Sequence, residues 1–455
     1  HRGALCPPGR MACDQCLGVI VNQQVLLTTY SKPAIAVKDF LRRPERVWAA
    51  ILLVVLLILV VTPVIRIVLN SFVFDASGPR MVEGAEVGEP TTFYWERVFG
   101  SRISRSVFYE PALHSFTIAV GMTAIALSLG CVLAWIVVRT DLPGKRFFSM
   151  VLIIPYIVPS WTIALAWITV FKTEQFGGTP GLLNAIFGIN VPVWMAYGYL
   201  PILISLGVHY IPYTFILMRG ALANIDSRLE ESAEILGASR TEILWRITFP
   251  IALPALGSAF VLTFSKGLGE FATQAFLGLP IQYYTLSTRV YSALSNRLYG
   301  EGYVLALVLI IATALMVWGN QKIIGTRKKF ITISGKGSRR VPVELKRWRK
   351  PVTIILTLFV IIFVLGPIIL LGWQSLMKYE GSYGLDNLTL HYWFGSGNPD
   401  LAEGQPGVFR SAFILNAVKN SVLLATITAI ISGMLGILIG YTVVRNRGTL
   451  ASRAV

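Results

Sequence analysis

Charged residues are scarce in this sequence, and their scarcity excludes an ordinary soluble domain. Of the 455 residues, 14% are charged and 54% are apolar, whereas a soluble domain carries about a quarter charged residues. Only four cysteines occur, none in a loop expected to face outside, so no external disulfide is expected. His-Glu-x-x-His, Gly-x-Ser-x-Gly and Gly-x4-Gly-Lys-Ser/Thr motifs are absent. The sequence therefore predicts no enzymatic activity and no bound cofactor.

Long apolar runs dominate the chain instead. A helix needs about 20 apolar residues to cross the roughly 30 Å of hydrocarbon in a bilayer. Because the runs lack the alternation of barrel strands, they predict an all-α integral membrane protein with eight spans. The predicted spans are 48–70, 113–138, 147–171, 194–218, 251–275, 302–324, 351–373 and 414–444.

Basic residues gather in alternate loops, which predicts the orientation in the membrane. The 325–350 segment is dominated by Lys and Arg, whereas loop 71–112 carries six acidic residues against four arginines. Basic loops stay in the cytoplasm, so the N-terminal tail at 1–45 and the 325–350 linker are expected inside. The net charge of +17 is explained by the retention of basic loops in the cytoplasm and by their contact with anionic lipid headgroups. These account for it better than nucleic-acid binding does.

An internal repeat organises the chain. Residues 114–139 resemble residues 420–445 at an offset of about 306, and Pro63 corresponds to Pro367 at an offset of about 304. We expect a duplicated six-span unit whose second copy stops after two spans, so the protein is expected to continue beyond Val455. The expected parts are the tail at 1–45, the first span and external loop at 46–112, the first core domain at 113–324, the basic cytoplasmic linker at 325–350 and the incomplete second copy at 351–455.

The internal loop at 219–250, here called the shelf, is too polar for a membrane core and too long for a simple turn. Its pattern predicts helices at 227–236 and 239–247, with Gly237 allowing either a turn or the close approach of another surface. Pro250 is expected to mark the start of the next span, because proline cannot continue a helix with normal hydrogen bonds. The shelf is therefore a candidate docking element.

The shelf resembles the EAA loop of type I ABC importer permeases, Glu-Ala-Ala, three residues, Gly, nine residues, Ile-x-Leu-Pro, with Ser232 and Phe249 as departures. The resemblance implies the type I ABC importer transmembrane fold, a six-helix unit followed by the start of a second copy. It implies a coupling helix seated in a groove of a separate ATPase, with Glu231 in contact and Gly237 setting the turn. The resemblance implies that the ATPase-coupling residues are Glu231, Ser232, Ala233, Gly237, Ile247 and Pro250. An ordinary Glu/Ala-rich surface helix is the alternative.

The stretch 153–161, with Pro155 and Pro159, is similar to many permeases of that family, and the stretch 269–294 is similar to its fused ferric-iron branch. This resemblance implies a permease of the bacterial inner membrane that works by alternating access with cytoplasmic ABC ATPase subunits and a periplasmic substrate-binding protein. Ferric iron is the favoured substrate, and polyamine, thiamine, sulfate and aminophosphonate stay open. An ion-gradient-driven secondary transporter is the other alternative, although the spans are poor in the midplane acids that such proteins use.

Few polar residues inside the spans are candidates for function. Lys266 and Glu270 lie one helical turn apart, and they either line the translocation path or neutralise each other as an i,i+4 ion pair. His209 is expected to be packed or hydrogen-bonded rather than metal-ligating. His391, in an outside loop, is a weak metal candidate too, and the Cys-x-x-Cys at 13–16 lacks the second pair of a zinc site. No metal site is expected.

Overall fold

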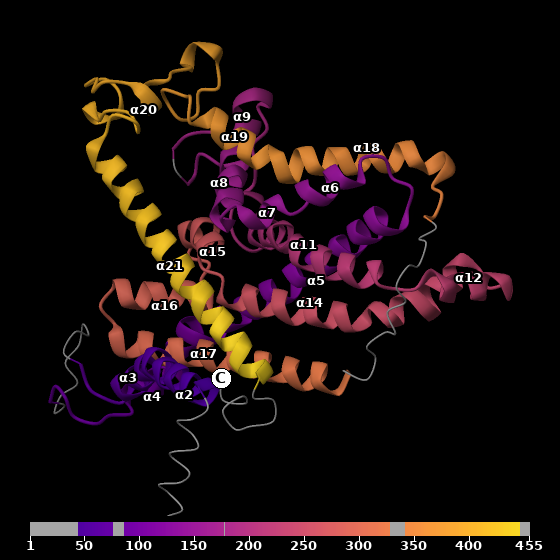
Figure 1. The fold of residues 1–455 in the computed structure, drawn as a ribbon. Coiled ribbons are helices and arrows are strands. Elements are labelled where there is room, and N and C mark those ends of the chain that lie inside the picture. The colour runs from indigo at the N-terminus through magenta and orange to yellow at the C-terminus, as the bar shows by residue number, and fades with distance from the viewer. Residues whose placement is uncertain (1–43, 76–85, 177, 328–341, 446–455) are drawn as a thin grey trace, which may run out of the picture. The chain divides into compact units, whose positions relative to one another are not determined.

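The computed structural model describes residues 44–75, 86–176, 178–327 and 342–445. These residues form helices joined by loops, with isolated β-bridges and no strand among them (Figure 1). Seven helices in the described part are long and apolar enough to cross a membrane, in agreement with the predicted all-α membrane fold. They are Ala50–Ser71, Arg105–Arg139, Val193–Ala223, Arg240–Gly269, Tyr299–Gly319, Lys346–Gln374 and Ala412–Thr442.

The predicted span over 147–171 is not one straight helix but is bent by 90° between Ile157 and Ser160. It consists of α6 (Lys145–Val151), α7 (Ile154–Ile157) and α8 (Ser160–Phe171). Pro159 has no N–H to donate and forces the preceding residue out of the helical region; accordingly Val158 is extended, with ψ of 138°. The bent pair, counted as one span, is the eighth candidate.

Other prolines are accommodated without ending the helix. Four π-helical segments each end two residues before a proline, and the wider turn makes room for a ring that otherwise clashes with the carbonyl four residues back. The segments are Leu57–Val61, Arg105–Tyr109, Leu244–Thr248 and Val360–Leu365, and the prolines are Pro63, Pro111, Pro250 and Pro367.

The helices that contain two of the predicted spans extend beyond the predicted boundaries. The helix of the second span begins at Arg105 rather than at 113, and the helix of the fifth span begins at Arg240, within the shelf, and passes through Pro250. The fifth span also ends at Gly269 rather than at 275, because the chain becomes extended at Glu270, with ψ of 135°.

The described residues within 67–412 form one compact unit, and the described residues 44–66 and 413–445 form another. The centre of the first unit is the packing of α5 (Glu110–Arg139) against α11 (Tyr199–Ala223) and α14 (Phe249–Gly269). A Cβ at Gly130 would lie 2.6 Å from the Cβ of Thr214, so a small residue is needed for α5 and α11 to approach this closely.

The remaining helices of this unit are short or peripheral, apart from the sixth span, α17 (Tyr299–Arg327), and the seventh, which contains α18 (Arg349–Phe359) and α19 (Gly366–Gln374). The others are α4 (Phe93–Phe99), α9 (Leu182–Phe187), α10 (Val193–Ala196), α12 (Ser227–Ile235), α13 (Arg240–Ile243), α15 (Ala272–Gly278), α16 (Leu286–Ser295) and α20 (His391–Phe394). The other unit contains α2 (Pro44–Leu56), the beginning of α3 (Thr62–Ser71) and nearly all of α21 (Ala412–Arg445).

The first span of the predicted second copy packs on the core of the first. Leu356, Val360 and Val364 are buried in the same apolar cluster as Phe148 and Phe215. At the other end of this span, the Thr169 hydroxyl donates to the Gln374 side-chain oxygen at 2.7 Å.

The loops that follow the two repeated spans have matching local structure. The indole N–H of Trp95 donates to the Ser71 hydroxyl at 3.3 Å, and that of Trp393 donates to the Ser375 hydroxyl at 3.1 Å. Antiparallel bridges and threonine-capped turns match too. The bridges are Val73–Pro90 and Met377–Leu388, and the turns join Thr91 to Phe93 and Thr389 to His391.

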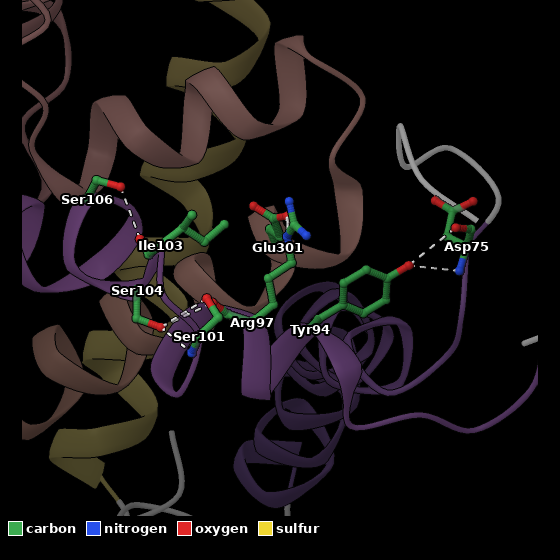
Figure 2. A network of polar contacts seen from close by, with 8 residues as sticks. All are labelled: Asp75, Tyr94, Arg97, Ser101, Ile103, Ser104, Ser106 and Glu301. Carbon is green, nitrogen blue, oxygen red and sulfur yellow. Dashed lines mark hydrogen bonds and ion pairs between the residues drawn. The ribbon is translucent and has the colours of Figure 1, made fainter. Parts of the chain in front are cut away.

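In the first of these loops, polar contacts tie α4 to the start of α17, as Figure 2 shows. Arg97 forms an ion pair with Glu301, whose side chain is 6% exposed. The Tyr94 hydroxyl accepts a hydrogen bond from the backbone N–H of Asp75 at 2.9 Å, and burial of the phenol raises the pKa of Tyr94. The loop is thereby held to the sixth span.

Candidate functional site

The shelf stands out from the packed helices as two arms joined by a turn (Figure 1). α12 is the first arm, and Asp226 caps it by accepting a hydrogen bond from the backbone N–H of Arg228 at 3.1 Å. The second arm begins at Arg240 and continues without a break into α14, so the separate helix predicted at 239–247 is wrong. A displacement of the second arm is therefore carried directly into a membrane span.

Gly237 makes the turn between the arms. Its φ of +87° is a left-handed conformation that residues with a Cβ rarely adopt. No heavy atom lies within 4 Å of a Cβ built there, so of the two roles that the sequence allowed, the structure shows the turn. The N–H groups of Gly237 and Ala238 donate to the carbonyls of Glu234 and Ala233, both at 3.0 Å, which is the Schellman ending of a helix.

A capping box fixes the start of the second arm. The Ser239 hydroxyl accepts from the backbone N–H of Glu242 at 3.3 Å, and the Glu242 carboxylate accepts from the backbone N–H of Ser239 at 3.1 Å. Hydrogen bonds from the Ser239 backbone and then from its hydroxyl lower the pKa of Glu242.

Glu230 anchors the first arm to two membrane helices. Its Oε1 accepts a hydrogen bond from Nη2 of Arg139, the last residue of α5, at 2.9 Å. The same oxygen accepts from the Thr248 hydroxyl at 2.6 Å. The side chains of Arg139 and Glu230 are only 10% and 25% exposed, so the pair is largely shielded from water.

The outer surface of the shelf is uncovered. Glu231 and Ser232, two of the predicted contact residues, are exposed. Next to them, Ile235 and Leu236 are each 86% exposed. Large apolar side chains grouped on a polar element are typical of a surface that a partner protein covers.

The other predicted positions serve the internal structure of the shelf. The Ala233 carbonyl takes part in the helix ending, as described above. Ile247 is half-buried, and Pro250 lies exposed within the continuous second arm. The structure thus separates an exposed pair, Glu231 and Ser232, from positions that shape the element.

A second polar site lies at the break between α14 and α15. The Glu270 carboxylate accepts a hydrogen bond from the Ser160 hydroxyl at 2.6 Å and another from the Tyr210 hydroxyl at 2.9 Å. Ser160 begins α8, directly after the bend at Pro159, and Tyr210 lies in α11. These three residues, the Glu270 cluster, join three helical segments.

Buried hydroxyl and amide groups continue from this cluster. The Ser287 hydroxyl donates to the Glu270 carbonyl at 2.6 Å and is within 2.8 Å of the Gln274 side-chain oxygen. Thr285 donates to the same oxygen of Gln274. A connected set of buried hydrogen bonds holds its members in one arrangement, because each unsatisfied group would cost free energy.

Lys266 does not pair with Glu270. In the described part of the chain its ammonium forms no ion pair, and its side chain is exposed although it lies in a membrane span. The self-neutralising pair considered from the sequence is therefore not what the structure shows.

No group of three or more His, Cys, Asp or Glu side chains in the described residues is arranged to hold a metal ion. His209 is 5% exposed and packs edge-on against the Tyr210 ring, with the ring centroids 4.8 Å apart. His391 stacks edge-on against Tyr392 in the same way. The Cys-x-x-Cys at 13–16 lies outside the described residues.

Glu230, Ser160 and Tyr210 were not identified from the sequence. Glu230 is adjacent to Glu231, and the sequence signal available for it is that neighbouring residues point about 100° apart around a helix, so the two glutamates of the first arm cannot share one direction. The only sequence feature that could have identified Ser160 is its place directly after a proline in a span. No sequence feature identifies Tyr210, because its partner is far away in sequence.

Comparisons with known proteins identify the segment that contains both sites. Residues 126–319 match the family described as "Binding-protein-dependent transport system inner membrane component". The chain is 27% identical over 353 residues to the ferric transport system permease protein FbpB of Actinobacillus pleuropneumoniae, covering 77% of this chain and 48% of that protein. It is 26% identical over 217 residues to the probable sulfate transport system permease protein cysT of Chlorokybus atmophyticus, covering 46% and 73%.

Among solved structures, a bacterial ABC transporter involved in the import of the acidic polysaccharide alginate aligns with a TM-score of 0.48 at 17% identity, covering 66% of this chain and 99% of that chain. The present chain spans about half the length of the ferric permease relatives it matches.

Proposed function

Because residues 126–319 belong to the family of binding-protein-dependent transport inner membrane components, we propose that this chain is the membrane-spanning subunit of an ATP-driven importer. In this proposal, ATP is hydrolysed by separate cytoplasmic ATPase subunits, and a periplasmic binding protein delivers the solute. The chain lies in the bacterial inner membrane with its N-terminus in the cytoplasm.

The observation that carries the proposal is the exposed end of the first arm of the shelf, Ile235 and Leu236, here called the tip. Ile235 and Leu236, each 86% exposed, stand beside the exposed Glu231 on an element that is otherwise firmly fixed. Burying such side chains against a partner is favourable by roughly 25 cal/mol for each Å² of apolar surface. We propose that the ATPase subunit covers this tip and contacts Glu231.

The contacts within the shelf support the proposal that it transmits a displacement from the ATPase to the membrane spans. Glu230 connects the first arm to Arg139 and Thr248, and the second arm is one helix with the fifth span. A partner that contacts the tip differently in its open and closed states shifts the equilibrium between two arrangements of the spans. Alternating access follows from that shift.

We propose that Lys266 and Glu270 belong to the translocation path. An ammonium facing hydrocarbon is costly, so the exposed Lys266 is expected to face an aqueous route or the other half of the transporter. Glu270 joins α8, α11 and α15, so breaking its hydrogen bonds would release these three segments from one another.

Ferric iron is the substrate we favour, since the match to a ferric permease covers 77% of the chain. Sulfate, polyamine, thiamine and aminophosphonate are the alternatives within the same proposal. An ion-gradient-driven transporter is a different proposal, and it leaves the exposed tip of the shelf without a function.

The repeat and its matching loops support a duplicated plan. We propose that the second copy begins at 351, after a basic cytoplasmic linker at 325–350, and that the complete protein supplies a second shelf. The Trp95–Ser71 and Trp393–Ser375 hydrogen bonds are the contacts that favour this reading.

Uptake by the complete transporter in membrane vesicles tests the proposal. Glu231→Lys and Gly237→Asp should each lower ATP-dependent uptake by about tenfold or more, a loss equivalent to about 1.4 kcal/mol, without preventing insertion. Glu403→Lys is the matched control, because Glu403 is an exposed acid in the loop at the opposite end of the second-copy span. Normal uptake by both shelf variants, or uptake driven by an ion gradient without ATP, would overturn the assignment.

A further inference from the structure

A cavity of about 620 Å³ opens where α5, α6 and α11 meet near the shelf. Arg139, Lys145, Arg146 and Arg219 bring four positive charges to its walls, and no acidic side chain is among the described residues that line it. Such a concentration of like charge is unfavourable unless an anion compensates it.

Three of the four cations are available to an anion. Arg139 is committed to Glu230 at 2.9 Å. Lys145 and Arg146 form no ion pair with any described residue, and Arg219 places its guanidinium 5.9 Å from the centroid of the Phe215 ring instead of beside a carboxylate. Arginine and lysine together provide the charge and the directed N–H groups that phosphate oxygens accept.

The same cavity has an apolar side. Val138 and Met150 line it, and Met150 is 73% exposed. Phe147, the neighbour of Arg146 on α6, is 56% exposed. On α6 two cations, Lys145 and Arg146, are therefore followed by the exposed apolar side chains of Phe147 and Met150. A ligand that carries both a phosphate and an acyl chain contacts both the cations and the apolar side of the cavity. A soluble anion contacts only the cations.

We propose that this cavity binds the phosphate headgroup of an anionic phospholipid from the cytoplasmic leaflet. Basic pockets between membrane helices on that side are suited to such headgroups. The inference rests on the orientation proposed above. Because Arg139 belongs both to the cavity wall and to the Glu230 anchor, a bound lipid lies beside the contact that fixes the shelf.

Titration of the full, detergent-solubilised chain with short-chain phosphatidylglycerol tests the site. Replacing two cations, Lys145→Gln with Arg146→Gln, should weaken binding about thirtyfold, since each basic residue near an anionic headgroup contributes about 1 kcal/mol. Lys346→Gln with Arg347→Gln is the matched control: both residues are exposed and basic, lie in the 325–350 linker and do not line the cavity. The control should bind within about twofold of the unmodified chain.

Two results would overturn the proposal. Equal weakening in the two double variants would show that general surface charge, rather than the cavity, attracts the lipid. Displacement of phosphatidylglycerol by an equal concentration of glycerol 3-phosphate would assign the cavity to a soluble anion. Phosphatidylcholine should not compete. The measurement needs neither ATPase nor transport, so its failure is distinguishable from failure of the importer assignment.

Discussion

The carboxylates of Glu230 and Glu270 link segments of this protein by the same kind of contact, but their surroundings differ. Glu230 and Glu270 each accept two hydrogen bonds, and in each case the donors come from two other segments of the chain. Around Glu230 the structure is open, because the tip of the shelf, Ile235 and Leu236, about one and a half helical turns away, is almost fully exposed. Around Glu270 it is closed, because the bonds continue into the buried side chains of Gln274 and Ser287.

The difference teaches what each carboxylate can do. A carboxylate beside an uncovered apolar tip fixes an element that a partner pushes. A carboxylate within a continuous buried network fixes helices against one another, and it is released only when the helices separate. Glu230 is thus suited to transmit a displacement of the shelf to the membrane helices. Glu270 is suited to hold α8, α11 and α15 together until these helices separate.

The largest effect should come from removing the open carboxylate. Glu230→Ala removes the carboxylate that pairs with the largely buried Arg139, and breaking such a pair costs about 3 kcal/mol. Thermal unfolding of the purified chain should show the loss. Glu231→Ala, one residue away and exposed, should change stability by less than about 0.5 kcal/mol. Equal losses in the two variants would remove the distinction between anchor and contact residue.

Tyr210→Phe should have the next largest effect, on the closed site. It removes one hydrogen bond to a charged group, worth about 2 kcal/mol, while retaining the ring. Unfolding measurements should show the loss. Tyr156→Phe is the control, since its hydroxyl contacts Tyr213 and not Glu270. If Tyr210→Phe is as stable as the unmodified chain, Glu270 does not link the three helical segments as assigned.

Ser239→Ala should have a smaller, local effect. Loss of the cap should cost about 1 kcal/mol in the second arm, measured by hydrogen exchange of residues 240–243. The folded state lowers the pKa of Glu242, so the capping box stabilises the arm above the unfolded pKa and loses part of this as pH falls through the lowered value. The difference between variant and unmodified chain should therefore shrink in acid, and a difference that grew in acid would contradict the assigned hydrogen bonds.

Lys266→Met should have the smallest effect on stability, near zero, because no described residue pairs with Lys266. Uptake, in contrast, should change if the residue lines the path. Labelling of Lys266→Cys by a membrane-impermeant maleimide during turnover checks its exposure to water. Protection in every state of the cycle would place the residue away from the path.

The sequence predicts the features that depend on local physics. Apolar runs locate all eight candidate spans, although one is bent, and the shelf and its turn at Gly237 follow from helix formers interrupted by glycine. The rule that proline ends a helix fails at Pro250, where a π-helical turn absorbs the ring. The Glu270 cluster could not be predicted, since Ser160 and Tyr210 are 110 and 60 residues from Glu270 and meet it only through tertiary packing.

Photo-crosslinking from the tip of the shelf tests the central claim most directly. With Leu236→p-benzoylphenylalanine in the assembled transporter, irradiation should join the chain to the cytoplasmic ATPase subunit. The same replacement at Leu385, which is 85% exposed in the loop beyond the second-copy span, should give no such product. A Leu236 position that reacts only with reagents on the periplasmic side, or never joins an ATPase, would contradict the account.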